Sequence, residues 1–188
     1  MRRLFRVPCL ISLITSLLLC PACQPDDAAE AIPTLQEQLV GTWELGSLDA
    51  ELSVDGEHLT VYLAQMAETY GLSAEEVALA LLLIQGQTIQ QLIGNEPSLT
   101  LLADQHFELL SRGEAPVAGR WQLSDDEQQL HLLPPSDSTL IFSIQAFQED
   151  ALTLLLDETF ATNLSLPGVP EFLRARLTMD WERAGGNE

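Results

Sequence analysis

The spacing of hydrophobic residues along the chain changes between period two and a helical period. From residue 41 to 54 apolar residues alternate with polar ones, at odd positions before Gly46 and at even positions after it. Alternation is typical of a half-buried strand, and a one-residue shift at a glycine is typical of a β-bulge. The pattern therefore predicts one long bulged strand that ends at Asp55-Gly56.

The period becomes helical between residues 57 and 94. One apolar set follows the spacing i, i+3, i+4, i+7 and i+11: Leu59, Tyr62, Leu63, Met66 and Tyr70. The next set has the spacing of a second amphipathic helix: Val77, Leu81, Ile84, Thr88 and Leu92. Between them, Gly71 suits a helix end, and Ser73 with Glu76 has the spacing of a capping box. The segment predicts an αα-hairpin over 57–94.

Strand signals return after Ser98. Short apolar or alternating runs are separated by turn residues, at 99–103, 106–110, 117–123, 128–133, 140–147, 151–156 and 172–182. Together with the first strand they make about eight, which is enough to close a small antiparallel barrel and remove its exposed edges. We therefore predict a mainly β domain over 34–184, with the hairpin inserted between its first two strands and a tail at 185–188.

The N-terminal segment has the form of a secretion signal. Residues 1–6 are cationic, residues 7–20 are largely apolar, and the run is too short for a membrane-spanning helix. Ala22 before Cys23 resembles the bacterial lipobox, in which the cysteine receives a lipid. Cys20 and Pro21 depart from that pattern, so a plain secretory signal cleaved nearby is the alternative.

This reading predicts a signal peptide at 1–22, lipidation of Cys23 and a polar, flexible tether at 23–33. The protein would then be attached to a membrane of the cell envelope through its lipid. Gln24 follows the cysteine, where Asp resembles the inner-membrane retention signal of some bacteria. We therefore expect the outer membrane.

The charge of the chain excludes one class of partner. The chain has 28 acidic residues, eight Arg and no Lys, and three of the Arg lie in the signal. The five remaining Arg leave the mature protein with a net charge of −23. Such a surface repels nucleic acid and anionic lipid headgroups, so membrane attachment would depend on the lipid. Two explanations of this negative charge are equally good. The source organism lives in high salt, or the protein is an ordinary acidic one from a GC-rich genome.

The three cysteines are Cys9, Cys20 and Cys23, so the predicted domain contains none. An internal disulfide, thiol catalysis and a cysteine zinc site are therefore excluded there. The core must be held by apolar burial.

No catalytic motif is present: there is no G-x-S-x-G, H-E-x-x-H, P-loop or dinucleotide fingerprint. His58, His106 and His131 are far apart, and a three-histidine metal site is the minor alternative to no metal. Asp125-Asp126-Glu127 lacks the glycine and distal glutamate of a calcium loop and suits a solvated turn. We expect no enzymatic activity, no cofactor and no metal.

Gly41-Thr42-Trp43 opens the first predicted strand, and Gly119 and Trp121 recur in a later one. This arrangement resembles the G-x-W signature of lipocalins, and more closely that of bacterial lipocalin-like lipoproteins, over about residues 41–183. The resemblance implies a lipocalin- or calycin-like barrel with Trp43 at its closed end, packed against Arg183 or, as the less favoured choice, Arg176. The second and third lipocalin motifs are not recognisable, and the hairpin stands where lipocalins have the loop over the open mouth.

A barrel of this size either is filled by side chains or holds one small ligand. We identify five aromatic or thioether residues that could contact a hydrophobic ligand: Tyr62, Met66, Tyr70, Trp121 and Phe142. The alternative is that they only pack, and that the acidic surface or the hairpin docks an envelope protein. An internal cavity beneath the hairpin would favour the carrier, whereas a packed interior with exposed apolar surface would favour the interaction protein.

Overall fold

A computed structural model describes residues 32–136, 139–162 and 171–185. The predicted signal peptide, Cys23, most of the tether and residues 186–188 of the tail lie outside these ranges. Every helix and strand described below lies within one compact unit, Thr34–Glu188.

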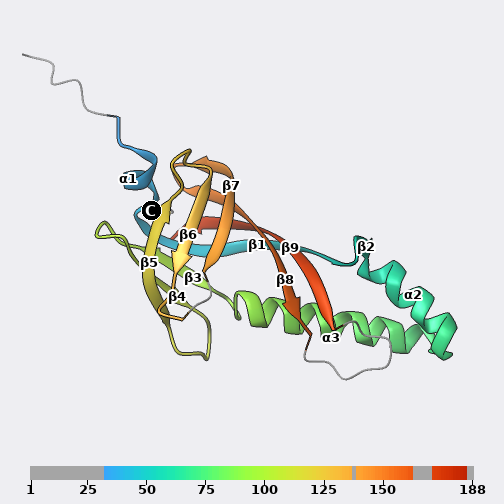
Figure 1. Cartoon of the computed structure of the whole chain (residues 1–188). Coiled ribbons are helices and arrows are strands. Elements are labelled where there is room, and N and C mark those ends of the chain that lie inside the picture. The colour runs from blue at the N-terminus through green and yellow to red at the C-terminus, as the bar shows by residue number, and fades with distance from the viewer. Residues whose placement is uncertain (1–31, 137–138, 163–170, 186–188) are drawn as a thin grey trace, which may run out of the picture. The chain divides into compact units, whose positions relative to one another are not determined.

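Eight antiparallel strands close into a barrel, which confirms the predicted fold class (Figure 1). The strands are β1 (Gly41–Val54), β3 (Ser98–Leu101), β4 (His106–Leu110), β5 (Val117–Leu123), β6 (Gln129–Leu133), β7 (Leu140–Gln148), β8 (Ala151–Ala161) and β9 (Phe172–Arg183). Each pairs with the next, and β9 returns to pair with β1. A ninth strand that the sequence pattern did not predict, β2 (Glu57–His58), pairs with the end of β1.

The predicted bulge is confirmed at Gly46. The register between β1 and β9 shifts between Leu45 and Ser47, so one residue of β1 has no partner. Because side chains alternate between the two faces of a strand, the extra residue moves the apolar set from odd to even positions. Leu52 and Val54 are buried as a result.

Large side chains from every barrel strand pack in the interior. Those exposed by at most 4% include Trp43, Leu99, Leu101, Phe107, Trp121, Leu130, Leu132, Phe142, Leu152, Leu154, Leu156, Leu177, Met179 and Trp181. They belong to one continuous hydrophobic cluster. Apolar burial therefore holds the barrel together, as the lack of cysteine in this part of the chain requires.

Beyond the barrel, β1, β9 and β8 continue as three strands. β3 pairs with β1 only up to Glu44, and β7 pairs with β8 only up to Leu156. We call residues 51–54, 157–161 and 172–176 the terminal ribbon. One of its faces carries buried Leu52, Val54 and Ala175, and its other face carries polar side chains.

The predicted αα-hairpin is confirmed between β2 and β3. It consists of α2 (Leu59–Tyr70) and α3 (Ala74–Leu92). The Ser73 hydroxyl accepts from the Glu76 N–H at 3.3 Å, and the Glu76 carboxylate accepts from the Ser73 N–H at 2.7 Å, which completes the capping box. Both helices contact β1 (Figure 1). Among the described residues, no helix is long and apolar enough to cross a membrane.

Candidate functional site

One end of the barrel is built around Trp43 and Arg183. The Arg183 guanidinium carbon lies 4.5 Å from the centroid of the Trp43 ring, and Phe147 meets the indole edge to face with centroids 6.2 Å apart. Arg183 therefore makes the cation–π contact that the lipocalin resemblance implies. Arg176, the other residue considered, lies in the terminal ribbon.

Arg183 also holds the short helix α1 (Leu35–Leu39) against the barrel. Its guanidinium donates to the carbonyl oxygens of Gln38 at 2.6 Å, Val40 at 2.9 Å and Glu149 at 3.0 Å. Two of these carbonyls stand at the C-terminal end of α1, where a cation is favoured. A Cβ at Gly41 would lie 2.5 Å from Arg183 Nη1, which explains the glycine of the G-T-W sequence.

Trp121 and Phe142, two of the five candidate ligand residues, are part of the packed interior. Trp121 is 1% exposed, and its indole N–H donates to the carbonyl of Leu102 at 3.0 Å. A Cβ at Gly119 would lie 2.7 Å from the ring of Phe107, so the chain is closely packed here. Both aromatic rings therefore contribute to filling the barrel.

The other three candidates lie on α2. Tyr62 and Met66 are half-buried, and Tyr70, in the last position of the helix, is 55% exposed. The five residues thus divide between the helical hairpin and the barrel interior. Whether any of them contacts a ligand stays a prediction.

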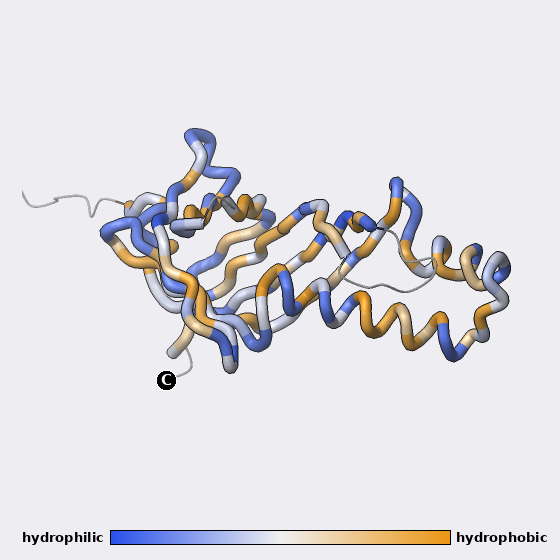
Figure 2. Tube along the Cα trace, turned by 60° about the horizontal axis from the view of Figure 1, so that its bottom comes forward, coloured by the Kyte–Doolittle hydropathy of each residue, from blue (hydrophilic) through white to orange (hydrophobic). Residues whose placement is uncertain are grey.

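An apolar surface on α3 was not predicted. Leu79, Leu82 and Leu83 are 57%, 66% and 44% exposed, and their spacing of three and four residues places them on one side of the helix. We call these three residues the hairpin stripe. The opposite side of α3 already packs through Ile84 and Thr88. Figure 2 shows hydrophobic segments along the helices of the hairpin.

The sequence did contain a signal for the hairpin stripe. Residues 77–84 are apolar without interruption. A helix that is apolar all round is normally covered on all sides. The helical period picks out only the buried set, because one amphipathic face is sufficient to predict the helix.

The charged residues of the hairpin are all negative. The segment 57–94 contains Glu57, Glu68, Glu75 and Glu76, and no Arg or Lys. The hairpin therefore combines an exposed apolar stripe with negative charge, which is complementary to an apolar surface that carries positive charge.

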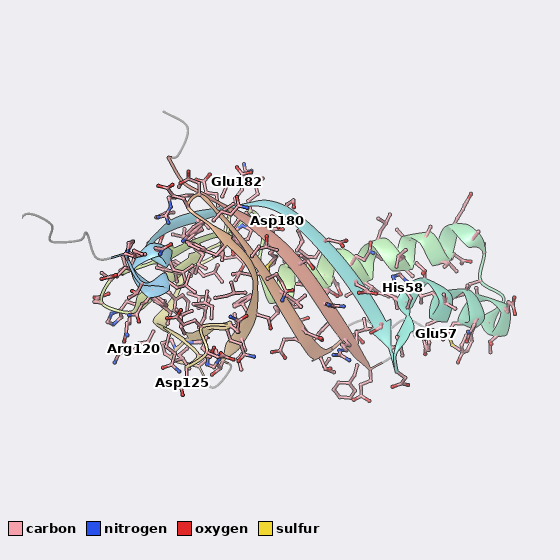
Figure 3. All side chains as sticks on the ribbon, turned by 90° about the horizontal axis from the view of Figure 1, so that it is seen from above. Glu57, His58, Arg120, Asp125, Asp180 and Glu182 are labelled. Carbon is pink, nitrogen blue, oxygen red and sulfur yellow. The ribbon has the colours of Figure 1, made fainter. Side chains whose placement is uncertain are left out.

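A polar groove of about 300 Å³ lies on the terminal ribbon. Its lining residues come from β1, the following turn, β2, β8 and β9: Glu51, Ser53, Gly56, His58, Asp157, Arg174 and Arg176. Figure 3 shows this part of the molecule, with Glu57 and His58 labelled at the β2 end. The groove combines two of the five arginines of the predicted mature chain with two carboxylates.

One ion pair organises the groove. Arg174 donates from Nε and Nη2 to the two oxygens of Asp157, at 2.6 and 2.7 Å. This two-bond contact holds the pKa of Asp157 below its ordinary value and raises the pKa of Arg174. Arg176 stands opposite Asp157 on β8 and opposite Glu51 on β1.

The residues considered for metal binding do not gather. Among the residues that the structure describes, no group of three or more His, Cys, Asp or Glu side chains is placed to hold a metal ion. Asp126 instead organises its own turn, because its carboxylate accepts from the Ser124 hydroxyl at 2.6 Å and from the Gln128 N–H at 3.2 Å.

Comparisons with known proteins give few relatives. No known family and no curated protein matches the chain. Among solved structures, the chain is similar to a DUF4847 family protein from Bacteroides vulgatus, with 15% identity and a TM-score of 0.32, over 72% of this chain and 90% of that one.

Proposed function

We propose that this chain is an exported, lipid-anchored and non-enzymatic envelope protein whose filled barrel presents the hairpin stripe to a protein partner. The observation that carries the proposal is the exposure of Leu79, Leu82 and Leu83 on a helix whose other side is already packed. Contiguous exposed apolar surface is characteristic of interaction sites.

The packed interior favours this function over that of a carrier. Trp43, Phe107 and Trp121 are each at most 2% exposed and occupy the inside of the barrel. Eight-stranded barrels are near the size at which side chains alone fill the interior. A rigid barrel then serves as the support from which β1 leads into the hairpin.

The partner that fits is a protein with an apolar groove bordered by Lys or Arg. An amphipathic helix commonly binds by laying residues spaced i, i+3 and i+4 into such a groove. The acidic hairpin and the net charge of −23 in the mature chain oppose association with a second copy of itself. A basic border on the partner would favour docking and speed association.

The docking proposal is tested in the native host with a photo-crosslinking residue at Leu82. The matched control is Val117 on β5, which is 45% exposed. A partner that is crosslinked from Leu82 alone is then purified and titrated with the full lipoprotein. We expect the Leu79→Ser, Leu82→Ser double variant to weaken binding at least tenfold, Val117→Ser to leave it within twofold, and added NaCl to weaken it.

Two results would contradict docking at the hairpin stripe. One is equal crosslinking from both positions, and the other is unchanged affinity of the double variant. An apolar molecule that co-purifies with the protein in native mass spectra would support the carrier function instead.

Lipid anchoring is tested separately at Cys23. We expect labelled fatty acid to be incorporated into the native protein and not into Cys23→Ser, which should leave the membrane fraction. Unchanged labelling of the variant would show that another residue carries the lipid. This result would leave the docking proposal standing.

A further inference from the structure

The groove on the terminal ribbon lies on a different face from the hairpin. Leu52 and Val54 of β1 belong to the same hydrophobic cluster as Leu59 and Leu63 of α2. Successive side chains of a strand point to opposite faces, so Glu51 and Ser53 lie on the face away from that cluster. The groove and the hairpin stripe are therefore two separate surfaces, and His58, which caps α2, lies at the edge of the groove.

The two arginines of the groove differ in how they are engaged. Both oxygens of Asp157 are used by Arg174. Among the described residues, no carboxylate lies within 4.0 Å of the Arg176 guanidinium, and that guanidinium makes no hydrogen bond. A guanidinium has five N–H donors in a planar fork that matches a carboxylate or phosphate. Arg176 is thus available to an oxyanion.

The negative end of the groove is available too. Glu51 stands opposite Arg176 on β1, and no ion pair or hydrogen bond of its side chain occurs among the described residues. His58 is engaged, since its Nδ1 lies 2.6 Å from the Thr60 hydroxyl at the start of α2. The charge of Arg176 does act on Asp157, whose pKa it helps to lower, but its N–H donors have no acceptor among the described residues. The groove therefore offers one cationic and one anionic group, on neighbouring strands, whose hydrogen-bonding atoms are unused.

The charge of the whole protein limits which ligand fits. Two arginines and two carboxylates cancel within the groove, and the mature chain around it carries −23. A free anion approaches against this field, whereas a ligand with its own positive charge does not. A cation alone would leave the N–H donors of Arg176 without an acceptor.

We propose that this groove binds a small zwitterion, with its carboxylate or phosphate on Arg176 and its positively charged nitrogen on Glu51. The volume of about 300 Å³ is at the lower end for small-molecule pockets and admits a ligand the size of a dipeptide or a lipid headgroup. The shared chemistry is one oxyanion and one cationic nitrogen on the same molecule.

The test uses two matched sets of three probes, titrated into the full-length protein and followed by calorimetry at low salt. Alanyl-alanine, its N-acetyl derivative and its amide separate the peptide zwitterion from the anion and the cation. Glycerophosphocholine, dimethyl phosphate and choline do the same for a headgroup. We expect the zwitterion of one set to bind at least tenfold more tightly than its two partners, and the set that responds identifies the source.

Variants then locate the binding. Arg176→Gln should weaken the zwitterion at least tenfold, and Arg176→Lys, which keeps the charge but loses the fork, should have an intermediate effect. Glu51→Gln should weaken the zwitterion and not the anion. The matched control is Arg120→Gln, because Arg120 is an exposed arginine of β5 that also makes no ion pair among the described residues.

The proposal is overturned if none of the six probes binds. It is also overturned if a singly charged probe binds as tightly as the zwitterion, or if Arg176→Gln and Arg120→Gln have equal effects. Thermal unfolding of each variant shows whether the fold is kept. Loss of docking at the hairpin stripe would not affect any of these results.

Discussion

Arg183 covers the indole ring of Trp43, with 4.5 Å between the guanidinium carbon and the ring centroid. The same guanidinium binds carbonyl oxygens of Gln38 and Val40, which precede it by 145 and 143 residues. One side chain of the last strand therefore joins the first strand and α1 at one end of the barrel.

Replacing Arg183 should destabilise the protein. We expect Arg183→Gln to lower the free energy of unfolding by about 1–3 kcal/mol, because the cation–π contact and charged hydrogen bonds to backbone carbonyls are lost together. Urea denaturation measures the change. Arg112→Gln is the control, since it removes the same charge from an exposed pair with Glu96. Equal effects of the two variants would mean that charge alone accounts for the loss.

Two glycines should respond to alanine in opposite directions. A Cβ at Gly119 would meet the ring of Phe107 at 2.7 Å and the backbone of Pro134 at 2.8 Å, so we expect Gly119→Ala to cost about 1–3 kcal/mol. Gly86 lies within α3 with open space around it, and Gly86→Ala should stabilise by about 0.5–1 kcal/mol. Thermal unfolding measures both effects. Shifts of the two melting temperatures in the same direction would contradict this packing.

Asp180 should contribute stability that depends on pH. Its carboxylate accepts from the hydroxyls of Ser47 at 2.7 Å and Thr153 at 2.8 Å, and these bonds hold its pKa below the ordinary value of 3.8. A lowered folded-state pKa gives stability that is present above the unfolded value and is lost as the pH falls through the folded value.

The pH effect is measured as the stability difference between the wild type and Asp180→Ala. We expect this difference to be largest near neutral pH and to shrink as the pH falls below 3.8. The control is Asp125→Ala, which removes the same charge from an exposed turn. Its effect measures how much stability changes when the acidic protein loses one negative charge. A difference that stays constant with pH would show that the two hydrogen bonds do not favour the ionised form.

Salt should stabilise the protein. The net charge is −20 for the whole chain and −23 without the signal. The negative side chains of the folded protein therefore repel one another, and added ions screen this repulsion. We expect the melting temperature to rise between dilute buffer and molar NaCl. The same value at both salt concentrations would count against a source that lives in high salt and would favour the explanation from genome composition.

Much of the secondary structure follows from short stretches of sequence. The alternation in residues 41–54, the shift at Gly46 and the pair Ser73–Glu76 involve positions a few residues apart, and all three are present in the structure. Period-two burial in β9 also appears as expected, with Leu177, Met179 and Trp181 buried. These features depend on local geometry, which a single sequence expresses directly.

The surfaces that carry the proposals could not be located from the sequence. Residues 77–84 show that α3 is apolar all round, but which side remains open depends on where β1 lies. The strand β2 was missed because its two residues have no period to detect.

The sequence by itself determined the eight barrel strands, the helical hairpin, the charge and the lack of disulfides in the barrel, since each depends on residue type or on neighbours along the chain. Only the tertiary structure decided that Glu51, Asp157 and Arg176 share one face and that Arg183 covers Trp43. These residues are brought together by strand register and barrel closure, and register is set by contacts between strands that are remote in sequence.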